Sequence, residues 1–143
     1  MPPPSDISVH FAEEQLPIQC RSVAEMDAAL DRLHADHLRS GSSTTPLAVS
    51  IVIPGYEIDT GLGADESFLC VQVEPCDGEY YLAVGDATAE GESRMFYGAG
   101  QDSYWAPKNL IPLSAARDAV RYFVEHQQRS PTLRWQDWSE RDV

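Results

Sequence analysis

The clearest pattern in this 143-residue chain is Asn109-Leu-Ile-Pro-Leu-Ser-Ala-Ala-Arg-Asp-Ala-Val-Arg-Tyr-Phe-Val-Glu-His-Gln-Gln-Arg-Ser-Pro-Thr-Leu-Arg-Trp135, around which the fold is expected to be organised. Pro112 suits the first turn of a helix, where its missing N–H leaves no hydrogen bond unmade. Apolar residues at helical spacing come next, namely Leu113, Ala116, Val120 and Phe123, with Ala119 beside them. This pattern predicts the end of a strand followed by a helix that buries one face.

The polar positions of this helix and the residues behind it predict its outer face and its end. Four charged residues lie off the apolar stripe and are expected to face water: Arg117, Asp118, Arg121 and Glu125. Ser130-Pro131 is expected to stop the helix, because the residue before a proline favours extended backbone. Leu133 and Trp135 alternate with polar neighbours, which predicts a final edge strand.

The N-terminal part predicts strand, short strand and helix. Ile7, Val9 and Phe11 alternate with polar residues as in a half-buried strand, and Ile18 marks a short second strand. Ser22-Val23-Ala24-Glu25 is a capping box. The helix behind it has an apolar stripe that ends near a stop at Gly41 and contains these residues: Met26, Ala29, Leu30, Leu33, His37 and Leu38.

The middle of the chain predicts strands separated by loops and turns. We expect strands at 47–53, 68–74, 79–84 and 94–97, loops at 40–46, 56–66 and 85–93, a turn at 76–78 and an irregular stretch at 98–108. With two helices and no strand–helix alternation, the fold class is α+β: a curved, mostly antiparallel sheet with two helices packed on one face. We expect one domain over 1–143, with 1–6 and 137–143 flexible and the end frayed from Gln136.

Composition limits the classes of partner. The formal net charge of −13 argues against nucleic acid or an anionic membrane as a direct partner. No run of apolar residues approaches the length of a membrane-spanning helix, and the first residues do not resemble a signal peptide. The odd count of cysteines indicates a reducing compartment, with Cys70 as a small core residue. We therefore expect a cytoplasmic protein that is a monomer or a weak homodimer.

Motifs for catalysis and cofactor binding are missing from the sequence. Gly61-Leu-Gly63 lacks the rest of a phosphate loop, and no G-x-S-x-G elbow occurs. His34 and His37 have a spacing that could seat a metal, but no cysteine or third histidine lies near them, so we expect a helix-surface or core-edge role. We expect no enzyme activity, no cofactor and no metal.

Acidic residues gather in one region of the sequence. Residues 56–102 contain eleven acids and one base, Arg94. Three interpretations stand side by side: a solvated surface, a docking face for a basic partner, and a calcium site that lacks the usual D-x-D-x-D-G loop. Tyr104 and Trp105 are either a lid over the core or interface anchors. The candidate partner-binding residues are Glu57, Asp59, Asp65, Glu66, Asp77, Glu79, Asp86, Glu90, Glu92, Tyr104 and Trp105.

The last 50 or so residues resemble a known family. Ile111-Pro112-Leu113, the helical apolar residues up to Phe123, then Pro131 and Trp135 resemble the first immunity-protein family of bacterial polymorphic toxin systems (Imm1-like). The stretch Tyr97-Gly-Ala-Gly100 is similar to the glycine-containing region that precedes this unit in the family. One difference is that Gln128-Arg-Ser130 stands where relatives often place a glycine before the proline.

The resemblance implies a cytoplasmic antitoxin that binds and blocks a cognate secreted toxin domain, often a nucleic-acid deaminase or nuclease. Carboxylates on such an inhibitor can occupy a basic cleft in place of phosphates. The alternative from another class is a small α+β enzyme or ligand-binding domain, with its pocket between sheet and helices. A long secreted protein with a toxin tail in the upstream gene would favour the antitoxin; a metabolic operon would oppose it.

Overall fold

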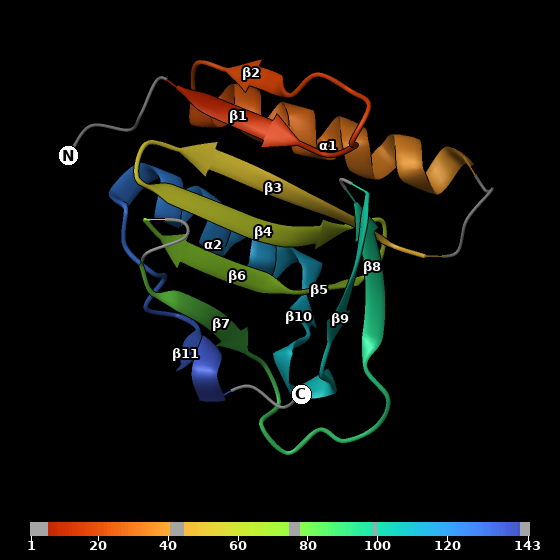
Figure 1. Cartoon of the computed structure of the whole chain (residues 1–143), viewed down its shortest axis with the longest axis vertical. Coiled ribbons are helices and arrows are strands. Elements are labelled where there is room, and N and C mark those ends of the chain that lie inside the picture. The colour runs from red at the N-terminus through yellow and green to blue at the C-terminus, as the bar shows by residue number, and fades with distance from the viewer. Residues whose placement is uncertain (1–5, 41–44, 75–77, 99, 141–143) are drawn as a thin grey trace.

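A large, mostly antiparallel sheet organises the computed structural model, which describes residues 6–40, 45–74, 78–98 and 100–140 (Figure 1). Seven strands follow the order β11-β7-β6-β4-β3-β1-β2, and the hairpin β8–β9 joins at β3 through a short parallel pairing. The strands of this sheet are β1 (Ile7–His10), β2 (Ile18–Cys20), β3 (Leu47–Ile53), β4 (Tyr56–Leu62), β6 (Leu69–Val73), β7 (Tyr80–Val84), β8 (Arg94–Gly98), β9 (Gln101–Trp105) and β11 (Arg134–Asp137). A second, two-stranded sheet pairs β5 (Glu66–Ser67) with β10 (Ile111–Pro112).

Two helices pack on one face of the large sheet. In Figure 1, α1 (Val23–Ser40) lies behind β1 and β2, and α2 (Leu113–His126) lies behind β4 and β6. The core between them contains Met26 and Leu30 from α1, and Val120 and Phe123 from α2. The predicted α+β fold, with a mostly antiparallel sheet and both helices on one face, is confirmed. None of the helices in the described ranges combines the length and the apolar composition of a membrane span.

The opposite face of the sheet carries a smaller core under the β8–β9 hairpin. Phe96 of β8 packs edge-on against Phe68, and Trp105 of β9 stacks on Phe68 with ring centroids 4.0 Å apart. Gly61 of β4 makes room for this hairpin, since a Cβ there would lie 2.4 Å from the Phe96 ring. The hairpin therefore covers one end of this face, whereas the two helices cover the other face.

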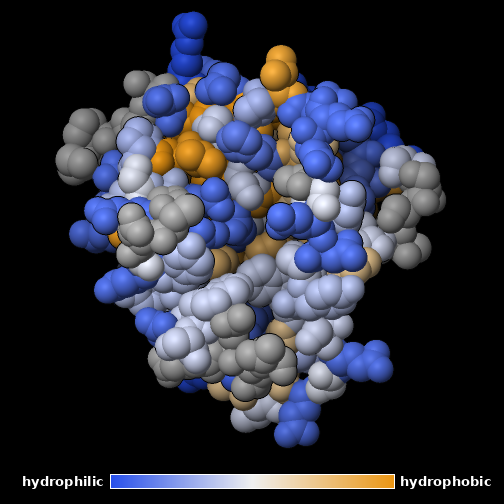
Figure 2. Space-filling view, viewed as in Figure 1, coloured by the Kyte–Doolittle hydropathy of each residue, from blue (hydrophilic) through white to orange (hydrophobic). Residues whose placement is uncertain are grey.

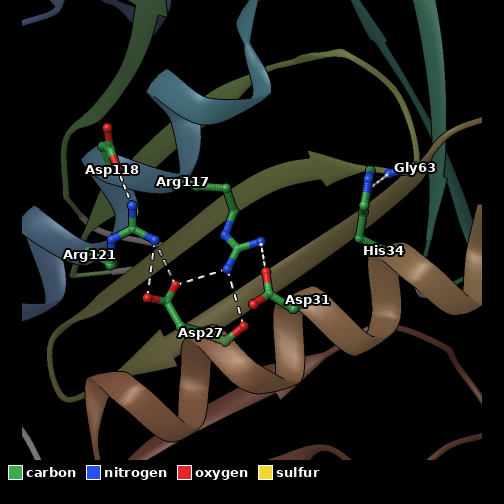
Figure 3. A network of polar contacts seen from close by, with 7 residues as sticks. All are labelled: Asp27, Asp31, His34, Gly63, Arg117, Asp118 and Arg121. Carbon is green, nitrogen blue, oxygen red and sulfur yellow. Dashed lines mark hydrogen bonds and ion pairs between the residues drawn. The ribbon is translucent and has the colours of Figure 1, made fainter.

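Charged residues join the two helices to each other (Figure 3). Arg117 of α2 donates to Asp27 at 2.9 Å and to Asp31 at 2.8 Å, both on α1. Arg121 donates to Asp27 at 3.0 Å and also pairs with Asp118. The prediction that Arg117 faces water is wrong, because its side chain is only 11% exposed and lies against α1. Asp118 is exposed, as expected.

Two segments that we expected to be irregular are strands. β4 occupies most of the predicted 56–66 loop, and β9 occupies the middle of the predicted 98–108 stretch. In β4, Ile58 and Leu62 face the helices while Glu57 and Asp59 face away. The ordinary alternation of a strand was not recognised in the sequence, because acids and Gly61 occupy the face of β4 that points away from the helices. Both predictions of irregular structure are therefore wrong.

The ends of the helices and of the chain also refine the sequence predictions. The Ser22 cap is confirmed, since the Glu25 amide donates to Ser22 Oγ at 3.1 Å, whereas the Glu25 carboxylate accepts from the Arg21 amide at 3.3 Å. Leu38 is exposed and does not extend the α1 stripe. α2 ends at His126 rather than at Ser130, with Gln127 in the left-handed conformation at φ 55°. Regular structure continues past Gln136, because β11 runs to Asp137 and a 3₁₀-helix spans Trp138–Glu140, so a frayed end from Gln136 is wrong.

The other predicted elements are found close to their expected positions. The strands at 7–11, 47–53, 68–74, 79–84 and 94–97 are confirmed as β1, β3, β6, β7 and β8, and the edge strand near Trp135 as β11. Trp135 packs against the main core, and its indole N–H donates to the Ser130 carbonyl at 3.0 Å. Cys70 is buried in the core, as expected. Gly41, Cys76 and Asp77 lie outside the described residues, so the predictions made for them are not tested.

Candidate functional site

A polar cluster lies on the sheet face that the helices leave uncovered. Glu57 and Asp59 are two residues apart on β4 and therefore project from the same face of the strand. Gln72 of β6 donates from Nε2 to Asp59 at 2.7 Å and to Glu57 at 3.1 Å. Ser50 of β3 donates to Asp59 at 2.6 Å. Three neighbouring strands thus hold two carboxylates side by side with fixed orientations.

The environment of this carboxylate pair disfavours its charge. Burial raises the pKa of Glu57 above its ordinary value, and the nearby Asp59 carboxylate raises it further. Burial also raises the pKa of Asp59, although the hydrogen bonds from Ser50 and Gln72 act in the opposite direction. No ion pair joins either carboxylate to a cation among the described residues. The pair is therefore a site at which a cation from outside would be favourable.

A crevice of about 250 Å³ lies between the polar cluster and the hairpin. Glu57, Asp59 and Gln72 form its floor, and Gln101 and Trp105 of β9 form one wall. Figure 2 shows this side of the molecule, and hydrophilic residues occupy much of the surface there. The crevice is too small for most cofactors, which need pockets of roughly 300–1,000 Å³. A single side chain of a partner would fit.

The other acidic candidates do not join this cluster. Asp65 and Glu66 lie at β5, where Glu66 pairs with Arg94 at 3.6 Å. Glu79 accepts a hydrogen bond from Tyr81 at the start of β7. Asp86, Glu90 and Glu92 belong to the long loop between β7 and β8, at the bottom of Figure 1. The acids are therefore distributed over several parts of the surface, and Asp77 lies outside the described residues.

The acids of the long loop differ from the β4 pair in their surroundings. The Asp86 carboxylate accepts from the backbone N–H of Thr88 at 2.9 Å and from its hydroxyl at 2.6 Å. These two hydrogen bonds lower the pKa of Asp86. Glu90 and Glu92 are exposed. These loop acids lie in solvent, so they contribute to the long-range electrostatic field of the molecule.

Tyr104 and Trp105 have different roles, although they are neighbours on β9. Trp105 is 7% exposed and belongs to the smaller core, so its interpretation as a lid is correct. Tyr104 is 64% exposed on the outer side of the hairpin, opposite Met95 in the register. Tyr104 alone of this pair is available to a partner. Neighbouring residues of a strand point to opposite faces, which explains the difference. It was not expected from the sequence, because irregular structure was predicted for this stretch.

The two histidines of α1 bond to backbone groups. His34 Nδ1 accepts from the Gly63 amide at 2.8 Å (Figure 3), and His37 Nε2 donates to the Thr45 carbonyl at 2.9 Å. Both contacts fasten α1 to neighbouring segments, which agrees with the core-edge role. Within the described ranges, no group of three or more His, Cys, Asp or Glu side chains could hold a metal ion.

Sequence reasoning missed several residues of this surface. Ser50 and Gln72 were not predicted as site residues, because their hydrogen bonds to the carboxylate pair depend on the register of β3, β4 and β6. It also missed Tyr97, which is half exposed on the outer side of β8. The alternation of Met95 and Tyr97 with Phe96 was a usable signal, since one face of an edge hairpin must meet solvent.

Comparison with known proteins now assigns the family. Among curated proteins, no sequence matches this chain. The sequence model described as Immunity protein Imm1 matches residues 14–137, which includes both helices and every strand from β2 to β11. Members of this family are immunity proteins against polymorphic toxins. Because the match spans most of its length, the chain belongs to the Immunity protein Imm1 family.

Proposed function

We propose that this protein binds and inhibits a cognate secreted toxin domain that acts on nucleic acid, either a deaminase or a nuclease. The observation that carries the proposal is the family match over residues 14–137. The protein would act in the cytoplasm by occupying the toxin's cleft, with no chemistry of its own. Its acidic candidates would contact the toxin, beginning with Glu57 and Asp59 on the uncovered sheet face.

The electrostatics of the carboxylate pair support this choice of toxin. A cleft that binds nucleic acid presents Lys and Arg to phosphates. The same Lys and Arg side chains can donate to carboxylates, and an Arg fork can bond two carboxylate oxygens at once. Glu57 and Asp59 lie side by side without a cationic partner among the described residues. A partner's cation would lower both raised pKa values, so binding would stabilise a pair that folding alone leaves strained.

Inhibition is tested with the toxin domain encoded by the neighbouring gene. The purified protein should bind this domain in a one-to-one complex and abolish its activity on nucleic acid. Co-expression should restore growth of cells that produce the toxin domain. A toxin domain that remains fully active in excess of this protein would contradict the proposal.

The contribution of charge is tested separately, through association rates. Reversal of Glu90 and Glu92 to Lys should slow association by about tenfold at low salt, because exposed charges steer encounter over a screening length of ~8 Å at 0.15 M salt. A matched reversal of Asp118 and Glu125 to Lys, on the helix-covered side, is the control and should change the rate less. Equal association rates for both variants would show that the charges of this loop do not steer association. This result would not contradict the proposed inhibition.

A further inference from the structure

A second concave site lies at the other side of the hairpin. A pocket of about 640 Å³ opens between the β1–β2 loop, the C-terminal part of α1 and β8. Its apolar lining comes from Phe11, Leu47, Met95 and Tyr97. Gly98 lines both this pocket and the crevice over the carboxylate pair. A partner that grips the turn of the hairpin would therefore reach both sites together.

Exposed apolar residues line this pocket or neighbour its lining residues in the sequence or the strand register. The large hydrophobic side chains that are exposed in the described part of the chain are Leu16, Leu38, Tyr97 and Tyr104. Tyr97 lines the pocket, Leu16 and Leu38 each follow a lining residue, and Tyr104 lies opposite the lining residue Met95. Elsewhere in the described chain the large hydrophobic side chains are covered at least in part. Exposed large apolar side chains near a pocket are typical of an interaction site.

The rim of the pocket is acidic. Glu13 and Glu14 of the β1–β2 loop line it, and the lining residues that the structure describes include no Lys or Arg. The Glu13 carboxylate lies directly against the hairpin turn, since a Cβ at Gly100 would be 2.4 Å from its Oε2 atom. Gly100, at φ 78°, thus permits the loop and the hairpin to close one side of the pocket.

We propose that this pocket receives a basic side chain, arginine or lysine, that projects from the toxin domain; the inference rests on the proposed function. The aliphatic stem packs on Phe11, Leu47 and Met95, as long basic side chains pack on apolar surfaces. The charged end meets Glu13 and Glu14, and the Tyr97 ring in the same lining is available for a cation–π contact. This contact is an anchor, distinct from the carboxylate pair on the sheet.

Charge and exposure select this occupant over the others. A second copy of the chain would bring another formal charge of −13 against an acidic rim, which opposes self-association. A small apolar ligand would leave Leu16 and Tyr104 exposed outside the pocket. A protein partner with a basic anchor covers these side chains and neutralises the two glutamates at once.

The test measures the affinity of the full chain for the toxin domain of the neighbouring gene, by calorimetry. Ala12→Phe narrows the pocket from its wall, Tyr97→Ala removes the exposed ring, and Glu13→Gln with Glu14→Gln removes the rim charge. An anchor contact of this kind changes affinity by roughly 10- to 100-fold, mainly through dissociation. Asp118→Asn with Glu125→Gln is the charge-matched control and should stay within about twofold.

The outcomes separate the pocket from the proposed function. Weakened binding by Tyr97→Ala and by the glutamate pair, with unchanged urea midpoints, supports the anchor even if Ala12→Phe fails to fold. Parent-like affinity of all folded pocket variants overturns the anchor and leaves inhibition intact. A parent chain that does not bind the toxin domain overturns both. Sedimentation that shows a dimer of the parent, lost in Tyr97→Ala, assigns the pocket to a second copy and overturns the toxin anchor.

Discussion

The two faces of the sheet differ in whether their carboxylates are paired with cationic side chains. Behind the sheet, Arg117 and Arg121 of α2 meet Asp27 of α1, so cations and carboxylates are matched within the fold (Figure 3). On the uncovered face, Glu57 and Asp59 lie together with hydrogen bonds but without a cation among the described residues. The charges behind the sheet are therefore paired within the protein, whereas we propose that the carboxylates on the uncovered face pair with a partner.

This difference distinguishes residues that stabilise the fold from residues that we propose to contact a partner. Charges that are buried and paired lose stability when one member is removed, because the other is left uncompensated. Like charges that share a surface repel each other and gain stability when one is removed. The sign of a mutational effect therefore reports the face to which a residue belongs.

The largest effect is expected in the core behind the sheet. Phe123→Ala should lower the free energy of unfolding by ~3–5 kcal/mol, since it opens a cavity beside Tyr56, whose ring lies 5.1 Å away. Tyr104→Ala removes an aromatic ring from the exposed side of the hairpin and should cost no more than ~0.5 kcal/mol. Urea denaturation of both variants measures the contrast. Similar losses for the two would mean that Tyr104 supports the fold and is not reserved for a partner.

A smaller loss is expected from the ion pairs between the helices. Arg117→Met keeps most of the side-chain volume but leaves Asp27 and Asp31 with one cation fewer, which should cost ~2–3 kcal/mol because the site is only partly solvated. Arg32→Met, at an exposed position of α1, is the matched control with an expected change within ~0.5 kcal/mol. Thermal and urea unfolding provide the comparison. If the Arg117 variant were as stable as the control, charge matching behind the sheet would have no structural role.

Local patterns allowed much of the fold to be predicted from the sequence. The unit from Ile111 to Trp135 was found because a proline at the helix start, an apolar stripe and an alternating strand are all local signals. β4 was missed because acids and Gly61 occupy the face that the helices do not cover. A strand prediction there would have placed Glu57 and Asp59 on one face at once.

Contacts between distant segments could not be predicted in this way. Arg117 was expected in water because its partner Asp27 lies 90 residues earlier in the chain. The acidic residues form a regional group in the sequence, but the structure separates them into a paired cluster and scattered acids, and this separation depends on strand order. The pocket beside Tyr97 likewise needs the β1–β2 loop, α1 and β8 to meet. No pattern within any one of these segments indicates that meeting.

The smallest predicted effect is a gain in stability when one charge is removed from the uncovered face. Glu57→Gln keeps an oxygen that accepts from Gln72 but removes one charge beside Asp59. The variant should be more stable than the parent at neutral pH, by no more than ~0.5–1 kcal/mol because Glu57 is partly exposed and solvent screens the repulsion. Urea midpoints at a series of pH values test this prediction.

The pH dependence of the free energy of unfolding tests the same prediction independently. Burial and Asp59 raise the pKa of Glu57, so the folded state holds a proton that the unfolded chain has already released. The free energy of unfolding of the parent should therefore fall as pH rises from the unfolded pKa, about 4.3, through the raised folded one. Glu57→Gln should flatten this part of the profile.

Asp86 supplies the opposite control. The hydrogen bonds from Thr88 lower its pKa, so its contribution to stability is present above the unfolded pKa and is lost as pH falls through the folded one. Asp86→Asn should thus remove a loss of stability that the parent shows as pH falls. Glu57→Gln should instead remove a loss of stability that the parent shows as pH rises. If both variants shifted the profile in the same direction, Glu57 and Asp59 would not repel each other in the folded state, and the uncovered face would have no charge in need of a partner.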